Sequence, residues 1–361
     1  MNSGKKSKRL DTVRNLVHEM LLEESVNKEG MLVHLYGVSN FASKLAMKRV
    51  QDSEITAIAG LLHGFYFYKT GIEDFPGPNS ADAVRPILRS AEIFTTDELS
   101  IILKSIFYQE DTHLVHGPYE EIIKDAILFQ MYFQNPGRSL SKVEISRLEN
   151  VFTELGISKE NIKADVNVAD ANVNVQTVNI NIEDRRSKLA DLAETLARQN
   201  IIGTPGDKRY QEICRYWPDS DIYKVLEANW CAAFVYHCCM KVGIKLPIRY
   251  PNRMYRLAGV GAWLDWAQLA ETVIFYRDIR EGFEPERGDI VIYEKLLTDN
   301  SHDHIGIVLA CDGDQLLVAE GNTDNKNYSS VLYRERGHCI LGYIRVDDSY
   351  QFNFQGEYRP I

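Results

Sequence analysis

At 361 residues the chain is longer than a single hydrophobic core usually supports, so we expect two domains. A formal charge of -10 argues against a nucleic-acid or anionic-membrane partner, and a hydrophobic content of 45% argues against a largely disordered chain. No stretch approaches the roughly 18 apolar residues of a membrane span, the first residues do not resemble a signal peptide, and the six cysteines form no CxxC pair. We therefore expect a cytoplasmic protein.

The apolar pattern of residues 10–157 predicts an all-α domain. Apolar residues recur at spacings of three and four, which places them on one face of a helix. Separate helices are predicted over residues 96–108, 119–133 and 142–155. The run Pro-Gly-Pro-Asn at 76–79 predicts a break in the helical pattern.

Residues 158–185 differ sharply in character, because valine and isoleucine alternate with asparagine through most of the segment. Alternation at period two is the signature of a strand with one apolar face. The alternative is a polar, poorly ordered linker, although such linkers contain few β-branched residues. Short strands of this kind pair with each other, with a domain or with another subunit. Of these partners we favour a second copy of the chain, so residues 164–183 predict a homo-oligomer.

Residues 186–350 predict an α+β domain in which helices precede an antiparallel sheet. An amphipathic helix is predicted over 184–199, and a buried helix begins at Cys231. Downstream, short apolar runs rich in β-branched residues predict strands, with a tight hairpin turn at 311–314. The predicted strands cover residues 290–293, 305–309, 316–319 and 340–344.

Cys231 is the candidate nucleophile. It stands at the predicted start of the buried helix, where the helix dipole and free amide groups favour the thiolate, the form that attacks a carbonyl carbon. Asn229 and Trp230 precede it in a loop that we expect to face a cleft, which makes both residues candidates for substrate binding. The alternative is a small core residue, the interpretation that we keep for Cys238 and Cys239.

A histidine and two polar residues downstream complete a thiol mechanism. His304 leads directly into a predicted strand that would hold its ring, whereas His302 lies among polar residues on a predicted loop. A base must reach the sulfur and must itself be oriented by a third group. Glu320 and Asn322 end the neighbouring strand and share one face at period two, so both can meet the imidazole. We therefore expect Cys231, His304, Glu320 and Asn322 to form one catalytic set.

These motifs resemble those of the CHAP family of cysteine amidases and peptidases, within the papain-like superfamily. They are Trp-Cys-Ala-Ala-Phe-Val at 230–235, Arg-Gly-Asp-Ile-Val at 287–291, His-Ile-Gly-Ile-Val at 304–308 and Glu-Gly-Asn at 320–322. The resemblance implies a papain-like fold. It also implies Cys231 as nucleophile, His304 as base and later acid, Glu320 as the group that orients the histidine, and Asn322 as an aid to polarisation. Many relatives carry glutamine where Trp230 stands, so the backbone amide of Cys231 becomes the candidate oxyanion donor.

The same resemblance implies a reaction, the hydrolysis of an amide bond through a covalent thioester without any cofactor. The implied substrates are peptides or other amides. Relatives commonly cut peptidoglycan, and some cut intracellular amides such as a polyamine conjugate. Because the chain shows no export signal, the cell-wall substrate is the weaker of these two expectations.

Over residues 11–134 the chain resembles the helical core of the HD-domain metal phosphohydrolases. His34, His63 and Asp125 match three of that family's metal ligands, but the aspartate that follows the second histidine is Gly64 here. The resemblance implies a divalent metal. The lost ligand implies a degenerate domain, kept for regulation, binding or assembly.

Two alternatives stay open. In the first, the N-terminal domain is an active metal-dependent phosphohydrolase or a nucleotide-sensing module that controls the C-terminal domain. In the second, the chain is a non-catalytic oligomeric assembly protein whose thiol site has lost its activity. The presence of all four C-terminal site residues favours the cysteine amide hydrolase over this second alternative.

Overall fold

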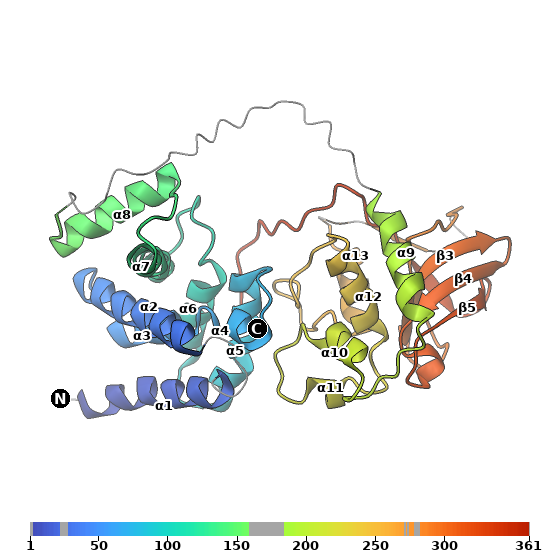
Figure 1. The fold of residues 1–361 in the computed structure, drawn as a ribbon, viewed down its shortest axis with the longest axis horizontal. Coiled ribbons are helices and arrows are strands. Elements are labelled where there is room, and N and C mark those ends of the chain that lie inside the picture. The colour runs from blue at the N-terminus through green and yellow to red at the C-terminus, as the bar shows by residue number, and fades with distance from the viewer. Residues whose placement is uncertain are drawn as a thin grey trace. The chain divides into compact units, whose positions relative to one another are not determined.

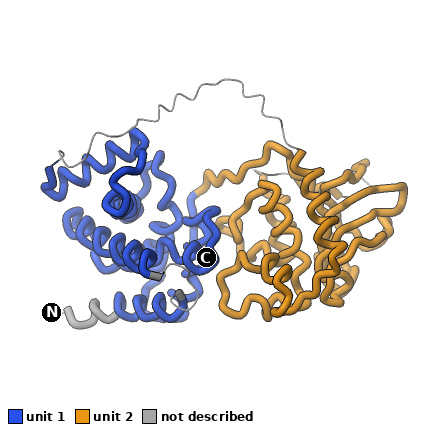
Figure 2. Tube along the Cα trace, viewed as in Figure 1, with its two compact units in different colours: residues 1–178, 357–360 blue, residues 179–356, 361 orange. Residues whose placement is uncertain are grey.

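The computed structural model describes residues 3–21, 28–158, 184–270, 272, 274–277 and 282–360. The chain divides into two compact units (Figure 2): an N-terminal unit of residues 1–178 and 357–360, and a C-terminal unit of residues 179–356 and 361. The strands predicted within 164–183 lie outside the described residues. In the part of the chain that the structure describes, no helix is long and apolar enough to span a lipid bilayer.

The N-terminal unit is built from helices (Figure 1). They are α1 (Ser3–Leu21), α2 (Lys28–Lys48), α3 (Ser53–Leu62), α4 (Phe65–Thr70), α5 (Pro76–Ser90), α6 (Thr96–Phe107), α7 (Pro118–Gln134) and α8 (Lys142–Leu155). The three helices predicted from periodicity are confirmed as α6, α7 and α8. Capping boxes, Thr95 with Glu98 and Ser141 with Glu144, explain why α6 and α8 begin where they do.

Helix α2 packs against both α3 and α7, and α3 is buried almost throughout.

One sequence prediction for this unit is wrong. Residues 76–79 form the first turn of α5, because Pro76 stands at a position where the helix needs no amide donor. The break lies one residue earlier, at Phe75, whose left-handed backbone has a φ of 53°.

The C-terminal unit places helices before strands, which confirms the predicted α+β order with an antiparallel sheet. Its helices are α9 (Arg185–Ala197), α10 (Lys208–Cys214), α11 (Ile222–Val225), α12 (Cys231–Lys241) and α13 (Val260–Ala267). Its strands are β1 (Phe275–Tyr276), β2 (Ile290–Tyr293), β3 (His304–Asp312), β4 (Gln315–Glu320), β5 (Ser330–Glu335) and β6 (Ile340–Ile344). They form one sheet in the order β1-β6-β2-β3-β4-β5. Strands β1 and β5 were not predicted, because β1 is very short and β5 lacks a clean apolar alternation.

Packing between α12 and the β3–β4 hairpin positions the site. Helices α9 and α12 both contact β3 and β4 (Figure 1). Helix α12 is buried from Cys231 to Met240, as its apolar sequence predicts. The hairpin turns at Gly313, with a φ of 56°, which confirms the tight turn predicted at 311–314. Antiparallel pairing then sets the start of β3 beside the end of β4.

Candidate active site

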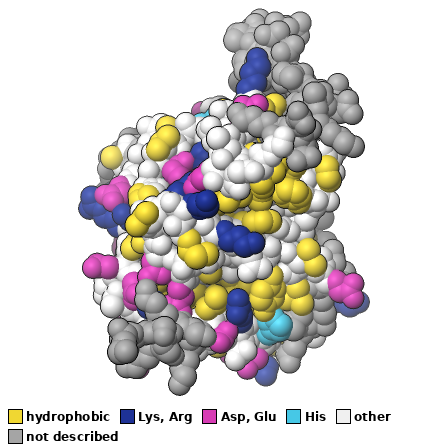
Figure 3. Space-filling view, turned by 90° about the vertical axis from the view of Figure 1, so that its left-hand side faces the viewer, with side chains coloured by type: hydrophobic (Ala, Val, Ile, Leu, Met, Phe, Trp, Pro, Cys, Tyr) yellow, Lys and Arg dark blue, Asp and Glu magenta, His cyan; other side chains and the backbone are white. Residues whose placement is uncertain are grey.

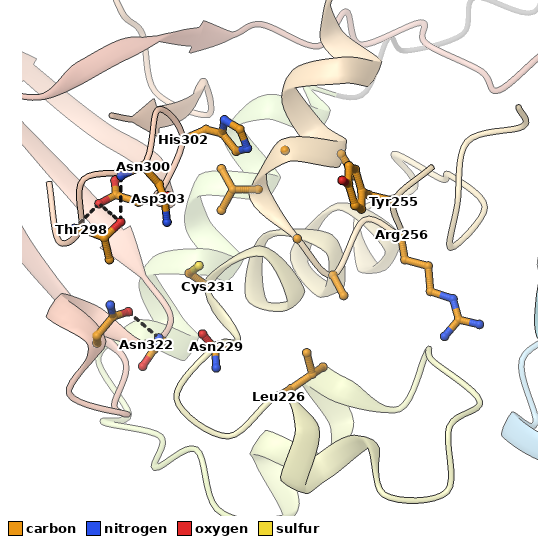
Figure 4. Close-up of a pocket in the computed structure, with 16 residues that line it drawn as sticks. Leu226, Asn229, Cys231, Tyr255, Arg256, Thr298, Asn300, His302, Asp303 and Asn322 are labelled. Atoms are coloured by element: carbon orange, nitrogen blue, oxygen red, sulfur yellow. Dashed lines mark hydrogen bonds between the residues drawn. The ribbon is translucent and has the colours of Figure 1, made fainter. Parts of the chain in front are cut away.

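Cys231 is the first residue of α12, and it lines an open cleft of about 550 Å³ (Figure 4). Only 7% of this residue is exposed. The side chain of Trp230, the residue before the helix, does not cap the first turn. The first amide groups of a helix have no partner inside it, so those of this turn are available to an acceptor outside the helix.

His304 and Glu320 form a buried pair beside Cys231. His304 begins β3 and Glu320 ends β4, so the pairing of these strands brings the two side chains together. Nε2 of His304 lies 2.9 Å from Oε2 of Glu320, and both side chains have 0% exposure. The other ring nitrogen of His304, Nδ1, is buried and bonds to no nitrogen or oxygen among the described residues. It is the ring atom left for the Cys231 thiol, with which the His304 side chain interacts.

The charges around His304 favour its protonated form. Burial alone lowers the pKa of a histidine, because it penalises the charged ring. The negative charge of Glu320 and its hydrogen bond to the ring, together with the Cys231 side chain nearby, outweigh burial and raise the pKa of His304 to about 10. Burial raises the pKa of Glu320, but His304 and Arg334 outweigh it and hold that pKa below its usual value. The resulting imidazolium is the partner that stabilises a thiolate.

Asn322 lies at the cleft, but its hydrogen bonds do not run to the imidazole. Strand β4 ends at Glu320, and Asn322 has a left-handed backbone with a φ of 51°, so the alternation at period two stops before it. Its Nδ2 donates to the Ala228 carbonyl oxygen at 2.7 Å and to Oδ1 of Asn325 at 3.0 Å. Asn322 therefore holds the loop that precedes α12, whereas Glu320 is the one that meets the histidine.

The two residues before Cys231 have different surroundings. Asn229 lines the cleft, where Figure 4 shows it beside Asn322. Trp230 has 0% exposure, and its indole Nε1 donates to Oδ1 of Asn327 at 3.0 Å. A side chain in the core does not touch a bound substrate. Of the two predicted binding residues, Asn229 lies at the cleft and Trp230 holds the start of the helix.

The structure adds Arg334 to the buried pair. Arg334 lies on β5, and its Nε and Nη2 donate to the two carboxylate oxygens of Glu320 at 3.0 and 2.7 Å. A sequence signal for Arg334 is its spacing from Leu332. Residues two apart in a strand share one face, so an arginine at this spacing lies on the same face as an apolar residue of a strand that pairs with β4. That signal exists only once β5 is known to be a strand.

Asp303 holds the loop between β2 and β3 at the rim of the cleft. Its carboxylate accepts the backbone amides of Leu296, Leu297 and Thr298 at 3.2, 2.6 and 2.6 Å. Burial raises the pKa of Asp303, but these hydrogen bonds outweigh it and lower that pKa. The loop thereby presents Thr298 and His302 to the cleft. His302, the less favoured base, lies on this loop rather than beside Glu320.

The three N-terminal residues predicted as metal ligands do not form one site. His34 and His63 meet, with their Nε2 atoms 3.1 Å apart. Asp125 is instead ion-paired through both oxygens, with Arg49 and Arg147 at 2.8 Å each. Within the described residues, no three His, Cys, Asp or Glu side chains gather closely enough to hold a metal ion. The donors do not fit the divalent metal that the HD resemblance implies, because two arginines occupy the carboxylate.

The surroundings of His34 and His63 favour neutral rings. Burial, together with the positive charge that His34 can carry, lowers the pKa of His63 to about 3. Burial also lowers the pKa of His34. Nδ1 of His63 lies 2.7 Å from the Gly60 carbonyl oxygen, and Nδ1 of His34 lies 2.7 Å from Oε1 of Gln134. Two neutral rings suit hydrogen bonding in the pocket of about 400 Å³ that they line.

Residues 223–322 match the family model of the CHAP domain. The matched range contains Cys231, His304 and Glu320 and ends before Arg334. The match supports a hydrolase of the amidase or peptidase type in the C-terminal unit. It does not extend to the N-terminal unit, so the HD resemblance stays a prediction. Searches of the curated proteins and of the solved structures found no significant match to the chain.

Proposed function

We propose that the C-terminal unit is a cysteine-dependent amide hydrolase that works through a thioester. The observation that carries this proposal is the triad of Cys231 at a helix N-terminus, the buried His304 beside it, and Glu320 on the far side of the imidazole. The triad supplies the nucleophile, the base and the orienting group that acyl transfer to a thiol needs. The CHAP match gives independent support for a hydrolase.

Acylation begins when Cys231 passes its thiol proton to His304 and Sγ attacks the carbonyl carbon of the substrate amide. The carbonyl electron pair moves onto oxygen, and the backbone amides of the first turn of α12, that of Cys231 included, are the candidate donors to this oxyanion. As the electron pair returns, His304 gives its ring proton to the nitrogen, the C–N bond breaks and the amine leaves. The acyl group remains on the sulfur as a thioester.

Deacylation uses the same histidine in the opposite direction. Neutral His304 takes a proton from water while the water oxygen attacks the thioester carbonyl. The C–S bond then breaks, the carboxylic acid leaves, and the proton on His304 returns to Sγ of Cys231. Glu320 assists this step because a carboxylate on Nε2 makes the ring a stronger base at Nδ1.

For the substrate we propose a peptide or another amide, and peptidoglycan fragments and cytosolic amides are the two sources to be tested side by side. The cleft presents amide and hydroxyl side chains, including Asn229, Thr298, Asn300 and Asn325. Such groups both donate and accept hydrogen bonds, as recognition of a peptide backbone requires. The volume of about 550 Å³ lies within the range of sites that bind small ligands.

A thiol-directed probe tests the assignment before any substrate is known. We expect a haloacetamide to label Cys231 faster than Cys311 and Cys339, although those two are more exposed. Faster labelling therefore reports activation rather than access. Cys231→Ala should lose this labelling. It should also lose hydrolysis when both proteins are incubated with peptidoglycan fragments and with cytosolic extract. Slower labelling of Cys231 than of Cys311, or hydrolysis that persists in the variant, would overturn the proposal.

For the N-terminal unit we propose a role in regulation, binding or assembly rather than metal-dependent catalysis. Asp125 is neutralised by two arginines, which supports a non-metal role. Apolar side chains are also exposed on this unit, among them Val33, Met47 and Phe133. Figure 3 shows hydrophobic side chains gathered among charged ones on the face that carries α2 and α8 in Figure 1. Exposed apolar surface of this kind favours contact with a partner.

We also propose that residues 164–183 join copies of the chain. The support is the alternation of valine and isoleucine with asparagine in the sequence. Replacing the segment with an equally long Gly-Ser linker should lower the molar mass measured by light scattering to that of one chain. A wild-type protein that is already a monomer would reject this role.

A further inference from the structure

We propose that Arg334 is a positioning residue of the thiol site: it holds the Glu320 carboxylate toward His304 and ties it to the loop that borders the cleft. The inference rests on the proposed function, since it concerns the group that orients the base. Arg334 lies beyond residues 223–322, the range that matches the CHAP model. Its role therefore follows from the contacts of this chain alone.

Arg334 contacts Glu320 at two points. Nε of the guanidinium donates to Oε1 at 3.0 Å, and Nη2 donates to Oε2 at 2.7 Å. The same Oε2 lies 2.9 Å from Nε2 of His304. A guanidinium is a rigid planar fork, so two parallel bonds fix the rotation of the carboxylate about its last side-chain bond. Arg334 thus sets which oxygen Glu320 presents to the imidazole.

The second contribution of Arg334 is a charge that does not change during the reaction. Glu320 has 0% exposure, and a buried carboxylate that lacks a cation tends to take up a proton. His304 supplies that cation only while its ring is protonated, and the proton leaves with the amine during acylation. The guanidinium keeps its charge throughout, because it does not titrate in proteins. Glu320 can therefore stay ionised in the thioester state, when His304 must act as a base.

Arg334 also reaches the loop at the cleft. Its Nη2 lies 2.9 Å from Oδ1 of Asp324, which belongs to the 3-10 turn η3 (Thr323–Asn325). Two residues of the same loop, Asn322 and Asn325, line the cleft. One guanidinium therefore connects the carboxylate that orients the base with the loop that borders the bound substrate.

Charged and titratable groups from five elements surround this guanidinium and the pair of Glu320 and His304. They are Cys231 on α12, Tyr293 on β2, His304 on β3, Glu320 on β4 and Asp324 on η3. Removing the guanidinium takes one positive charge from this cluster, which raises the pKa of Glu320 and of His304. The acidic and alkaline limits of reactivity at Cys231 should therefore both move to higher pH.

Carboxymethylation of Cys231 by iodoacetate tests this proposal without a substrate. The reagent needs a thiolate, and as an anion it is also attracted by the imidazolium. Rates are measured across pH by mass spectrometry of the Cys231 peptide in the full chain. In Arg334→Gln we expect the rate at neutral pH to fall about tenfold and both limits to rise by on the order of one pH unit.

Two further variants serve as comparisons. Arg334→Lys keeps the charge but loses the fork, so it should return the pH limits toward the wild-type values and recover only part of the rate. Glu335→Gln removes a charge from the neighbouring, exposed position of β5 and should behave as the wild type. In a Glu320→Gln background, Arg334→Gln should have little further effect on the rate, because the residue through which it acts is already changed.

The outcomes separate this proposal from the proposed function. If Arg334→Gln reacts more slowly but its pH limits do not move, the role of Arg334 is merely structural and the proposal is overturned. A rate and pH profile equal to those of the wild type would also overturn it. If Arg334→Gln does not fold, Arg334→Lys decides in two backgrounds. A slower reaction in the wild-type background but not in Glu320→Gln supports the proposal, whereas equal slowing in both backgrounds, or none in either, overturns it. A wild-type protein in which Cys231 reacts no faster than Cys311 contradicts the proposed function instead.

Discussion

Two buried histidines, one in each unit, shift their pKa in opposite directions. The pKa of His304 rises to about 10, whereas that of His63 falls to about 3. Burial acts on both rings in the same sense, so the partner makes the difference. His304 meets the carboxylate of Glu320, and His63 meets the imidazole of His34. A buried histidine becomes a strong base only where a negative charge accompanies it, and otherwise it stays a neutral hydrogen-bonding group.

The arginines of the two units differ in a related way. In the C-terminal unit, Arg334 shares Glu320 with the histidine, because Oε2 of this carboxylate has room for both. In the N-terminal unit, Arg49 and Arg147 each bind one oxygen of Asp125. One arginine supports the carboxylate that meets His304, while two arginines convert a carboxylate into a structural ion pair.

Replacing each histidine tests this comparison with the largest expected effect. His304→Ala should lower amide hydrolysis roughly 10⁴-fold, because the proposed reaction loses its base. His63→Gln should leave hydrolysis within about twofold of the wild type, because the neutral ring has no part in the proposed reaction. Thermal unfolding of both variants is the control, since both rings are buried. A similar loss in the two variants would contradict the assignment.

Glu320→Gln removes the charge behind His304 while keeping the shape of the side chain. Without that charge, burial should lower the pKa of His304, and hydrolysis should fall roughly 10³-fold or more. The change also leaves Arg334 with one fewer anion, so we expect the free energy of unfolding to drop by about 1–3 kcal/mol. Steady-state kinetics and denaturant unfolding measure the two effects. Hydrolysis within a few-fold of the wild type would show that Glu320 does not tune the histidine.

The opposite pKa shifts predict opposite pH dependences of stability. The pKa of His304 lies above its ordinary value of 6.5, so its charged form stabilises the C-terminal unit below pH 6.5, and this stability is lost as the pH rises toward about 10. The pKa of His63 lies below 6.5, so its contribution is present above pH 6.5 and is lost as the pH falls toward about 3.

Thermal unfolding of the full chain, measured at several pH values between about 4 and 10, checks these two trends. Hydrogen-exchange mass spectrometry then assigns each loss of stability to a unit. Glu320→Gln should flatten the alkaline trend, and His63→Gln should flatten the acidic one. An alkaline loss that persists in Glu320→Gln would assign it to another group.

The smallest expected effect concerns metal. Because arginines occupy Asp125, we expect elemental analysis of the purified protein to find less than stoichiometric iron or manganese, and chelation to leave hydrolysis unchanged. His34→Ala is the matched variant. Stoichiometric metal that disappears in His34→Ala would restore the metal-dependent alternative and weaken the contrast between the two units.

Local patterns predicted most elements of both units and three residues of the candidate site. Cys231 begins a helix, His304 begins a strand and Glu320 ends one, and each of these places is marked by the residues next to it in the chain. Asn322 departed from its expected contact because a left-handed residue breaks the alternation beyond β4. Strand β5, and Arg334 with it, lacked a local pattern to mark it.

The sequence by itself determined which residues are candidates for thiol chemistry and the order of helices and strands that carries them. Helix and strand periodicity depends on neighbours a few residues away, so a single chain suffices to find it. Only the tertiary structure decided the partners: Arg334 for Glu320, two arginines for Asp125, and the core for Trp230. Buried ion pairs join residues that are far apart in the chain, and the packing of whole elements determines which charges meet.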